Sequence, residues 1–291
     1  MKDYYEIIED LQALLTQTSA LDQTLPYRQP AGWLEHFRQR LLDHQPDLLI
    51  IAKQVQLPHS PRLGLYVEQL WLALINSHPD YQLLSHNLQI TADKQTIGAF
   101  DFLLRHCPAA SQCQQGRIEH WELACKYYLA VSPDDEQQLP PVWLGPNLND
   151  DWISKRNKLL AKQIRLGEQP AAQAVLSTLG IDHIDQKMIL ASGRVFKAAE
   201  QLQLPRDGHW YTQHQWQLLD HTNTTYEQAK LDWIQPKLAG QWIDCSTDRL
   251  TKPVFVTTVL ACGQLVCCFI VPDDWPAKAQ KKAAAISAAA L

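Results

Sequence analysis

The sequence lacks the long apolar run that a membrane-spanning helix needs. No stretch reaches the roughly 18 consecutive apolar residues of such a span, and the first residues, MKDYYEIIEDLQ, are acidic where a signal peptide would be basic and then apolar. The seven cysteines are odd in number and contain no CxxC pair, which favours a reducing compartment over a disulfide framework. We therefore expect a cytoplasmic protein without a membrane partner.

Glycine, and the motifs built on it, are also scarce. Among only 11 glycines there is no GxSxG, no GxGxxG and no Walker A loop, so no sequence motif supports acyl transfer or nucleotide binding. The net charge of -5 argues against a protein that coats nucleic acid through bulk charge. Any site for a polyanion is therefore expected to be small.

Apolar residues are plentiful, at 46% of the 291 residues and with ten Trp, which is ample for a globular fold. This length allows one substantial core with appendages, or two domains. We expect a helical N-terminal extension, a core, an α+β C-terminal extension and an Ala-rich tail that frays. Their boundaries are residues 1–60, 61–200, 201–276 and 277–291. In the third of these, 226–238 is expected to be helical, and 253–271 to form two strands joined at Gly263.

The hydrophobic pattern predicts the order of elements in the core. RLGLYVEQLWLALIN, residues 62–76, has the periodicity of an amphipathic helix. A second helix, WISKRNKLLAKQIRL at 152–166, should begin at an N-cap among residues 149–151 and end at Gly167. Strands are expected over 81–91, 96–105, 118–131 and 187–196. This order predicts an α/β (α+β) fold with an αβββαβ core and a mixed central sheet.

Three isolated acids, Glu68, Asp101 and Glu122, lie in apolar surroundings on three consecutive elements of this core. An unpaired, buried carboxylate is costly, and carboxylates gathered together repel one another. A divalent cation is the simplest way to neutralise them. Mg²⁺ suits such a site because it takes one or two carboxylates and completes its shell with water and phosphate oxygens. The sequence therefore predicts that these three acids hold Mg²⁺ or Mn²⁺.

Structural roles for the same residues stay open. Glu68 could pair with Arg62 or a core hydroxyl, and Glu122 could form an ion pair with Lys126 that only specifies strand register. His120 is interpreted as a polar residue at a strand end rather than as a ligand. The tryptophans are interpreted as core residues rather than as platforms for bases.

The acids and their order resemble the PD-(D/E)XK nuclease superfamily, which has a Glu on a helix, an Asp on the second strand, and an acid followed by Lys on the third. This resemblance covers residues 62–196. A closer resemblance covers residues 62–276 and is to a bacterial domain-of-unknown-function family, number 1853, that is grouped with those nucleases. The stretches that carry it are RLGLYVEQLW, TIGAFDFLL, HWELACKYYL, WLGPNLNDDWISKRNKLLAKQ and FIVPDDWP.

The resemblance implies a Mg²⁺-dependent phosphodiester hydrolase that acts on DNA or RNA through in-line attack of water on phosphorus. Asp101 and Glu122 match the metal-binding acids, Glu68 matches the helix acid, and Lys126 is the candidate for the motif lysine. The superfamily usually has Lys two residues after the acid, where this sequence has Ala124. Lys126 lies four positions after Glu122, so their Cα atoms would be about 13 Å apart along a strand, whereas a lysine two positions after the acid would be about 6.6 Å away.

The predicted helix after the third strand adds basic residues that could bind substrate. Lys155 or Lys158 could take the place of the motif lysine, and with Lys162 and Arg165 they form a stripe opposite apolar residues. Such a stripe could contact a phosphate backbone, although any solvated amphipathic helix has one. Gln163 lies nearer the apolar side, and a Gln on this helix assists the active site in some relatives.

Two other functions remain open. One is a catalytically inactive nuclease-fold module that keeps the scaffold and binds nucleic acid or a protein partner. The other is a structural component of an assembly, with the aromatic C-terminal region as its interface.

Overall fold

The computed structural model describes residues 2–17, 19–108, 116–133, 139–199, 204–219, 224–243 and 249–290. Contacts divide the chain into two compact units. The first contains Met1–Cys125 and Arg156–Ser192, and the second contains Lys126–Lys155 and Gly193–Leu291. Three elements contribute residues to both units: β3 (Arg117–Val131), α5 (Trp152–Lys158) and β5 (Gln186–Ala198).

The helical N-terminal region forms as the sequence predicts. It consists of α1 (Tyr4–Thr16), α2 (Trp33–His44) and α3 (Leu48–Ala52), and α1 contacts both of the others. A capping box fixes the start of α1, because Asp3 accepts from the Glu6 amide and Glu6 accepts from the Asp3 amide, each at 2.9 Å. These helices belong to the first unit.

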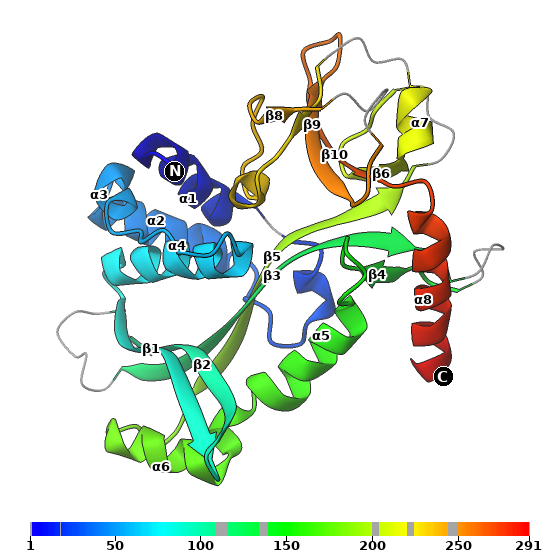
Figure 1. Ribbon diagram of the computed structural model, residues 1–291. Coiled ribbons are helices and arrows are strands. Elements are labelled where there is room, and N and C mark those ends of the chain that lie inside the picture. Colours follow the sequence, from blue (N-terminus) through cyan, green and yellow to red (C-terminus); the bar gives the residue numbers. More distant parts are fainter. Residues whose placement is uncertain are drawn as a thin grey trace. The chain divides into compact units, whose positions relative to one another are not determined.

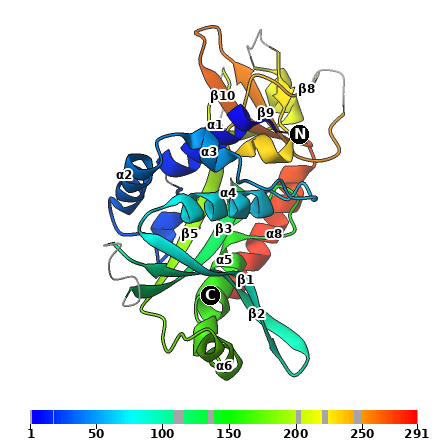
Figure 2. The same ribbon diagram turned by 90° about the vertical axis from the view of Figure 1, so that its left-hand side faces the viewer.

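The first unit is built on the antiparallel strands β1 (Tyr81–Ala92), β2 (Gln95–His106) and the first part of β3. The helices α4 (Leu63–Ser77) and α6 (Pro170–Thr178) both contact β1 and lie on opposite sides of the β1–β2 hairpin (Figures 1 and 2). On the α6 side, a buried cluster consists of Ile90, Phe100, Leu103, Leu166, Ala172, Leu176 and Ile181. All four strands predicted for the core are present.

The pairing of β2 with both of its neighbours is interrupted at Asp101. On β1, His86 pairs with Phe102 and Leu88 pairs with Phe100, but the pair between them is missing. On β3, the pairs end at Phe102 with Trp121. Asp101 therefore has no paired residue on either neighbouring strand, on β1 because the ladder skips it and on β3 because the ladder ends at Phe102.

The helix predicted over residues 152–166 is not continuous. It begins at Asp151, whose carboxylate accepts from the Ser154 amide at 2.7 Å, and α5 is followed by a π-helical turn at Leu159–Gln163. There the Ile164 amide donates to the Leu159 carbonyl at 2.9 Å, which widens the turn by one residue. The wider turn lets Leu159 and Ile164, five residues apart, both be buried. Gly167 lies in a 3₁₀ turn, so its expected role as a helix cap is wrong.

The second unit contains a mixed sheet, which confirms the predicted α+β class. Its strand order is β5-β6-β10-β9-β7-β8, and β4 pairs with β3. The pairs β5–β6 and β6–β10 are parallel, whereas β10–β9, β9–β7 and β7–β8 are antiparallel. The bounds are β4 (Val142–Leu144), β6 (His209–Thr212), β7 (Tyr226–Glu227), β8 (Gln241–Trp242), β9 (Val254–Val259) and β10 (Leu265–Val271).

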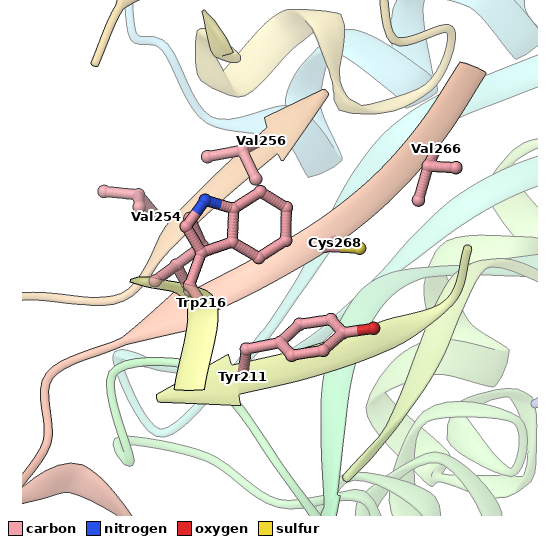
Figure 3. Packing of buried hydrophobic residues seen from close by; sticks show 7 residues of the cluster. Tyr211, Trp216, Val254, Val256, Val266 and Cys268 are labelled. Atoms are coloured by element: carbon pink, nitrogen blue, oxygen red, sulfur yellow. The ribbon is translucent and has the colours of Figure 1, made fainter. Parts of the chain in front are cut away.

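One core cluster of this unit combines two aromatic rings with aliphatic side chains and a cysteine (Figure 3). The rings of Tyr211 on β6 and Trp216 on α7 (Gln213–Gln217) meet edge to face, with centroids 5.3 Å apart. Val254 and Val256 of β9 belong to the same cluster. The predicted pair of strands around Gly263 is confirmed as β9 and β10.

Three expectations about local structure are wrong. Residues 226–238 form β7 and a 3₁₀ turn rather than a helix. The Ala-rich tail forms α8 (Trp275–Ala290), in which Trp275, Ala279 and Ala283 make a buried stripe at four-residue spacing. The cysteines are not all free thiols, because Cys107 is in a disulfide. Among the described helices, none combines the length and the apolar character that crossing a membrane requires.

Candidate metal centre

Asp101 is the centre of a group of ionisable side chains in the first unit. Its carboxylate accepts from the backbone amide of Leu123 at 2.7 Å. Burial, together with the nearby charges of Glu122 and Glu68, raises the pKa of Asp101 from 3.8 to about 7, and the hydrogen bond from Leu123 offsets only part of this rise. The structure therefore brings the three acids predicted from sequence into electrostatic contact.

Glu122 lies on β3 and is fully buried. Its carboxylate accepts from His120 Nε2 at 2.9 Å and from the Gln163 amide nitrogen at 2.9 Å. Gln163 reaches Glu122 from the π-helical turn. The hydrogen bond from Gln163 supports its predicted place at the site.

His120 is a buried neighbour of Glu122, so its interpretation as a strand-end residue is wrong. Burial lowers the pKa of His120 to about 3, which keeps the imidazole neutral at ordinary pH. Since Nε2 must carry the proton that it donates to Glu122, Nδ1 is an acceptor. Within the described part of the chain, this buried Nδ1 has no hydrogen-bond partner. The ring packs edge to face on Phe100, with centroids 4.7 Å apart.

Glu68 contacts a histidine that sequence reasoning missed. His86 Nε2 lies 2.7 Å from the Glu68 carboxylate, and the His86 ring stacks on Phe102 at 5.1 Å. The expected alternatives for Glu68, Arg62 or a core hydroxyl, are not its partner. No sequence signal separates His86 from the other polar residues of β1.

The donor set fits a site with two protein carboxylates better than one with three. No group of three His, Cys, Asp or Glu side chains among the described residues is arranged to hold a metal ion. Asp101 and Glu122 act on each other electrostatically, and their oxygen atoms are the ligand type that Mg²⁺ prefers. Because Mg²⁺ commonly takes one or two carboxylates and retains water, these two residues fit it.

Lys126 has a partner in the second unit. Its Nζ lies 2.5 Å from the carboxylate of Asp150, and both side chains are partly exposed. Glu68, Asp101 and Glu122 all belong to the first unit. The structure thus gives the candidate lysine an ion pair of its own.

The basic residues after β3 are mostly at the surface. Lys158 and Lys162 are exposed, and Lys155 is half-buried. Arg165 pairs with Glu168 at 2.8 Å. The π-helical turn changes the angular spacing on which the predicted stripe depends, because its hydrogen bonds join residues five apart and each residue between Lys158 and Arg165 then advances by a smaller angle.

A second buried acid on β3, Glu119, also escaped sequence reasoning. It accepts from Arg117 at 2.7 Å and from the Trp121 ring nitrogen at 2.8 Å, and His106 Nδ1 lies 3.3 Å away. Burial raises the pKa of Glu119, but these partners outweigh it and hold the pKa below its usual value. The i, i+2 spacing of Arg117, Glu119 and Trp121 is the signal that could have predicted this network.

Comparison with known families decides the relationship of the chain. A family model described as a domain of unknown function, DUF1853, matches residues 8–261. The chain belongs to the DUF1853 family. Asp101, Glu122, His120 and Gln163 all lie within the matched region of this DUF1853 protein, whereas α8 lies beyond it. No curated protein and no solved structure matches the chain.

Proposed function

We propose that this DUF1853 protein is a Mg²⁺-dependent phosphodiester hydrolase of the PD-(D/E)XK type that acts on nucleic acid. The observation that carries the proposal is the placement of two carboxylates beside each other in sequence-distant strands: Asp101 accepts from the amide of Leu123 at 2.7 Å, and Leu123 directly follows the fully buried Glu122. Burial first, and the charge of Glu122 second, raise the pKa of Asp101. The observed order α4-β1-β2-β3-β4-α5-α6-β5 contains the expected αβββαβ succession, with β4 and α6 as additional elements, and so supports the nuclease-like core. A cytoplasmic location is part of the proposal, and the disulfide of Cys107 is the observation that it must accommodate.

Each residue has a distinct part in this proposal. Asp101 and Glu122 would hold Mg²⁺ or Mn²⁺, and the charge of Glu68 adds to the negative potential at the site. Bound Mg²⁺ would supply activation of water and neutralisation of phosphate charge. Gln163 and His120 fix the orientation of Glu122 through their hydrogen bonds.

The cationic residues would act on the substrate rather than on the metal. Lys158 and Lys162 are exposed and suited to contacts with the phosphate backbone, and Lys155 is proposed to add to them. Lys126 is proposed to assist by stabilising phosphate charge, with Asp150 as its partner in the absence of substrate.

The experiment is incubation of the purified protein with linear, branched and single-stranded DNA and RNA, with and without Mg²⁺ or Mn²⁺. We expect metal-dependent cleavage that Asp101→Asn and Glu122→Gln abolish. Glu119→Gln is the matched control, because Glu119 is also buried on β3 but is paired with Arg117. Equal cleavage by all four proteins would identify a contaminant, and no cleavage by any of them would contradict the proposal.

A second candidate is an inactive module of the same fold that binds nucleic acid. The ion pair of Lys126 with Asp150 favours it, because a lysine held by an acid is not free to stabilise phosphate. This candidate predicts substrate binding in a gel-shift assay without cleavage. It also predicts that Lys158→Glu and Lys162→Glu weaken that binding and reduce its dependence on salt.

A further inference from the structure

Asn87 has an unusual backbone conformation for a residue inside a strand. Its φ is +49°, in the left-handed region that glycine adopts freely and that L-residues other than Asn and Asp rarely adopt. Asp93 and Lys94 also have positive φ, but they form the turn between β1 and β2, where such values are usual. No turn explains Asn87, because β1 continues on both sides of it.

The position of Asn87 coincides with the interruption of the sheet at Asp101. The pairs His86 with Phe102 and Leu88 with Phe100 place Asn87 opposite Asp101, yet these two residues do not pair. A left-handed residue rotates its peptide groups away from the direction that the ladder requires. Asn87 therefore accounts for the loss of pairing at Asp101.

On its β3 side, Asp101 makes a hydrogen bond through its side chain rather than through its backbone. The pairs between β2 and β3 end at Phe102, and the amide of Leu123 donates to the side chain of Asp101 at 2.7 Å instead of to a backbone carbonyl of β2. The carboxylate thus accepts from a backbone amide that the ladder leaves unpaired, in the residue directly after Glu122.

We propose that Asn87 is a positioning residue for the metal centre, whose left-handed backbone opens the sheet so that the Asp101 carboxylate faces the Leu123 amide and Glu122. The inference rests on the proposed function for its role in metal binding. Its structural half, the link between Asn87 and the Asp101 hydrogen bond, stands without that function.

The test compares Asn87→Val, which cannot adopt the left-handed conformation without strain, with Asn87→Gly, which adopts it freely. Asp93→Val is the matched control, since Asp93 has the same φ of +49° in the same hairpin but lies at its turn. Mn²⁺ binding is followed by electron paramagnetic resonance. We expect Asn87→Val to weaken Mn²⁺ binding about tenfold or more, while Asn87→Gly and Asp93→Val bind as the natural protein does.

Hydrogen exchange of the Leu123 amide in the metal-free protein provides a second readout. We expect exchange to be faster in Asn87→Val than in the natural protein and to be restored in Asn87→Gly. Unchanged Leu123 exchange in Asn87→Val would overturn the inference. An equal loss of Mn²⁺ binding in Asp93→Val would also overturn it, because general strain in the hairpin would then suffice. A natural protein that binds no Mn²⁺ would contradict the proposed function, and Leu123 exchange would still decide the role of Asn87.

Discussion

Glu119 and Glu122 are both buried on β3, three residues apart, and point to opposite faces of the strand. Glu119 is paired with Arg117 and His106, and its pKa is lowered. On the other face, Glu122 accepts from the neutral His120 and Gln163, and its charge raises the pKa of Asp101. The difference teaches that burial alone does not distinguish a candidate functional acid from a structural one, whereas the charge of the neighbouring side chains does.

The largest expected effect is on the rate of cleavage and concerns Asp101 together with Glu122, the acid on the other face of β3 from Glu119. Asp101→Asn and Glu122→Gln should each lower the rate of Mg²⁺-dependent cleavage by about 10³-fold or more, the scale of removing a principal charge-stabilising group. Initial rates at pH 8 measure this. If Glu119→Gln lowered the rate as much under conditions where it is folded, the comparison between the two faces would break.

The next effect is on stability and concerns the Glu119 face. Glu119→Ala should lower the free energy of unfolding by about 2 kcal/mol, because it leaves the Trp121 N–H without its acceptor and removes the partner of Arg117, whose own side chain is half exposed. Urea denaturation at pH 8 measures the change. A loss well under 1 kcal/mol would show that Glu119 is not a structural acid.

The substitution Lys126→Ala tests whether Lys126 contributes to the reaction at Asp101 and Glu122. If Lys126 stabilises phosphate charge, its loss should slow cleavage by about 10²-fold. The free energy of unfolding should change by less than about 1 kcal/mol, because both partners of the Lys126–Asp150 pair are partly exposed. Asp150→Asn is the control, since it releases Lys126 without removing it. An unchanged rate in Lys126→Ala, with cleavage intact, would remove the lysine from the mechanism.

The smallest effect is a pH dependence of stability. The folded pKa of Asp101, about 7, is above its unfolded value, so ionisation opposes folding and stability is lost as the pH rises through about 7. Asp101→Asn removes this cost. We expect it to raise the free energy of unfolding by roughly 1–2 kcal/mol at pH 8 and by much less at pH 5, because a pKa unit corresponds to about 1.4 kcal/mol before relaxation.

Urea denaturation of Asp101→Asn and the natural protein at both pH values measures this difference. Asp80→Asn should instead lower the free energy of unfolding at both pH values, because Arg40 lies 2.6 Å from Asp80 and its hydrogen bonds hold the pKa of that carboxyl low. If Asp101→Asn were destabilising at pH 8, the account of Asp101 as a repelled acid would be wrong.

Periodicity was sufficient to predict α4 and the strands β1, β2, β3 and β5, but it missed the short strand β4 and the π-helical turn that follows α5. It could not predict the register of β1 and β2. Thr91 pairs with Thr96 but Ile90 pairs with Gly98, so Ile97 is an extra residue that shifts the pairing by one position. Without this bulge, His86 would be opposite Asp101 rather than Phe102.

The candidate site shows the same limit. The isolation of Glu68, Asp101 and Glu122 in apolar sequence predicted a shared site, and the charges of Glu68 and Glu122 do act on Asp101. The contacts of each acid, however, depend on distortions with no periodic signal. The π-helical turn that places Gln163 on Glu122 is one of them. The helix α8 was missed for a different reason, since Ala-rich sequence becomes a stable helix only when residues such as Trp275 and Ala279 find a surface to bury against.

The most direct test of a divalent cation between Asp101 and Glu122 is a Mn²⁺ titration followed by electron paramagnetic resonance. The account predicts that the natural protein binds Mn²⁺ at pH 8, and binds it about tenfold more weakly at pH 6, because protons compete for a carboxyl with a pKa of about 7. Asp101→Asn should lose the binding and Glu119→Gln should keep it. No binding by the natural protein at pH 8, or equal binding by Asp101→Asn, would contradict the account.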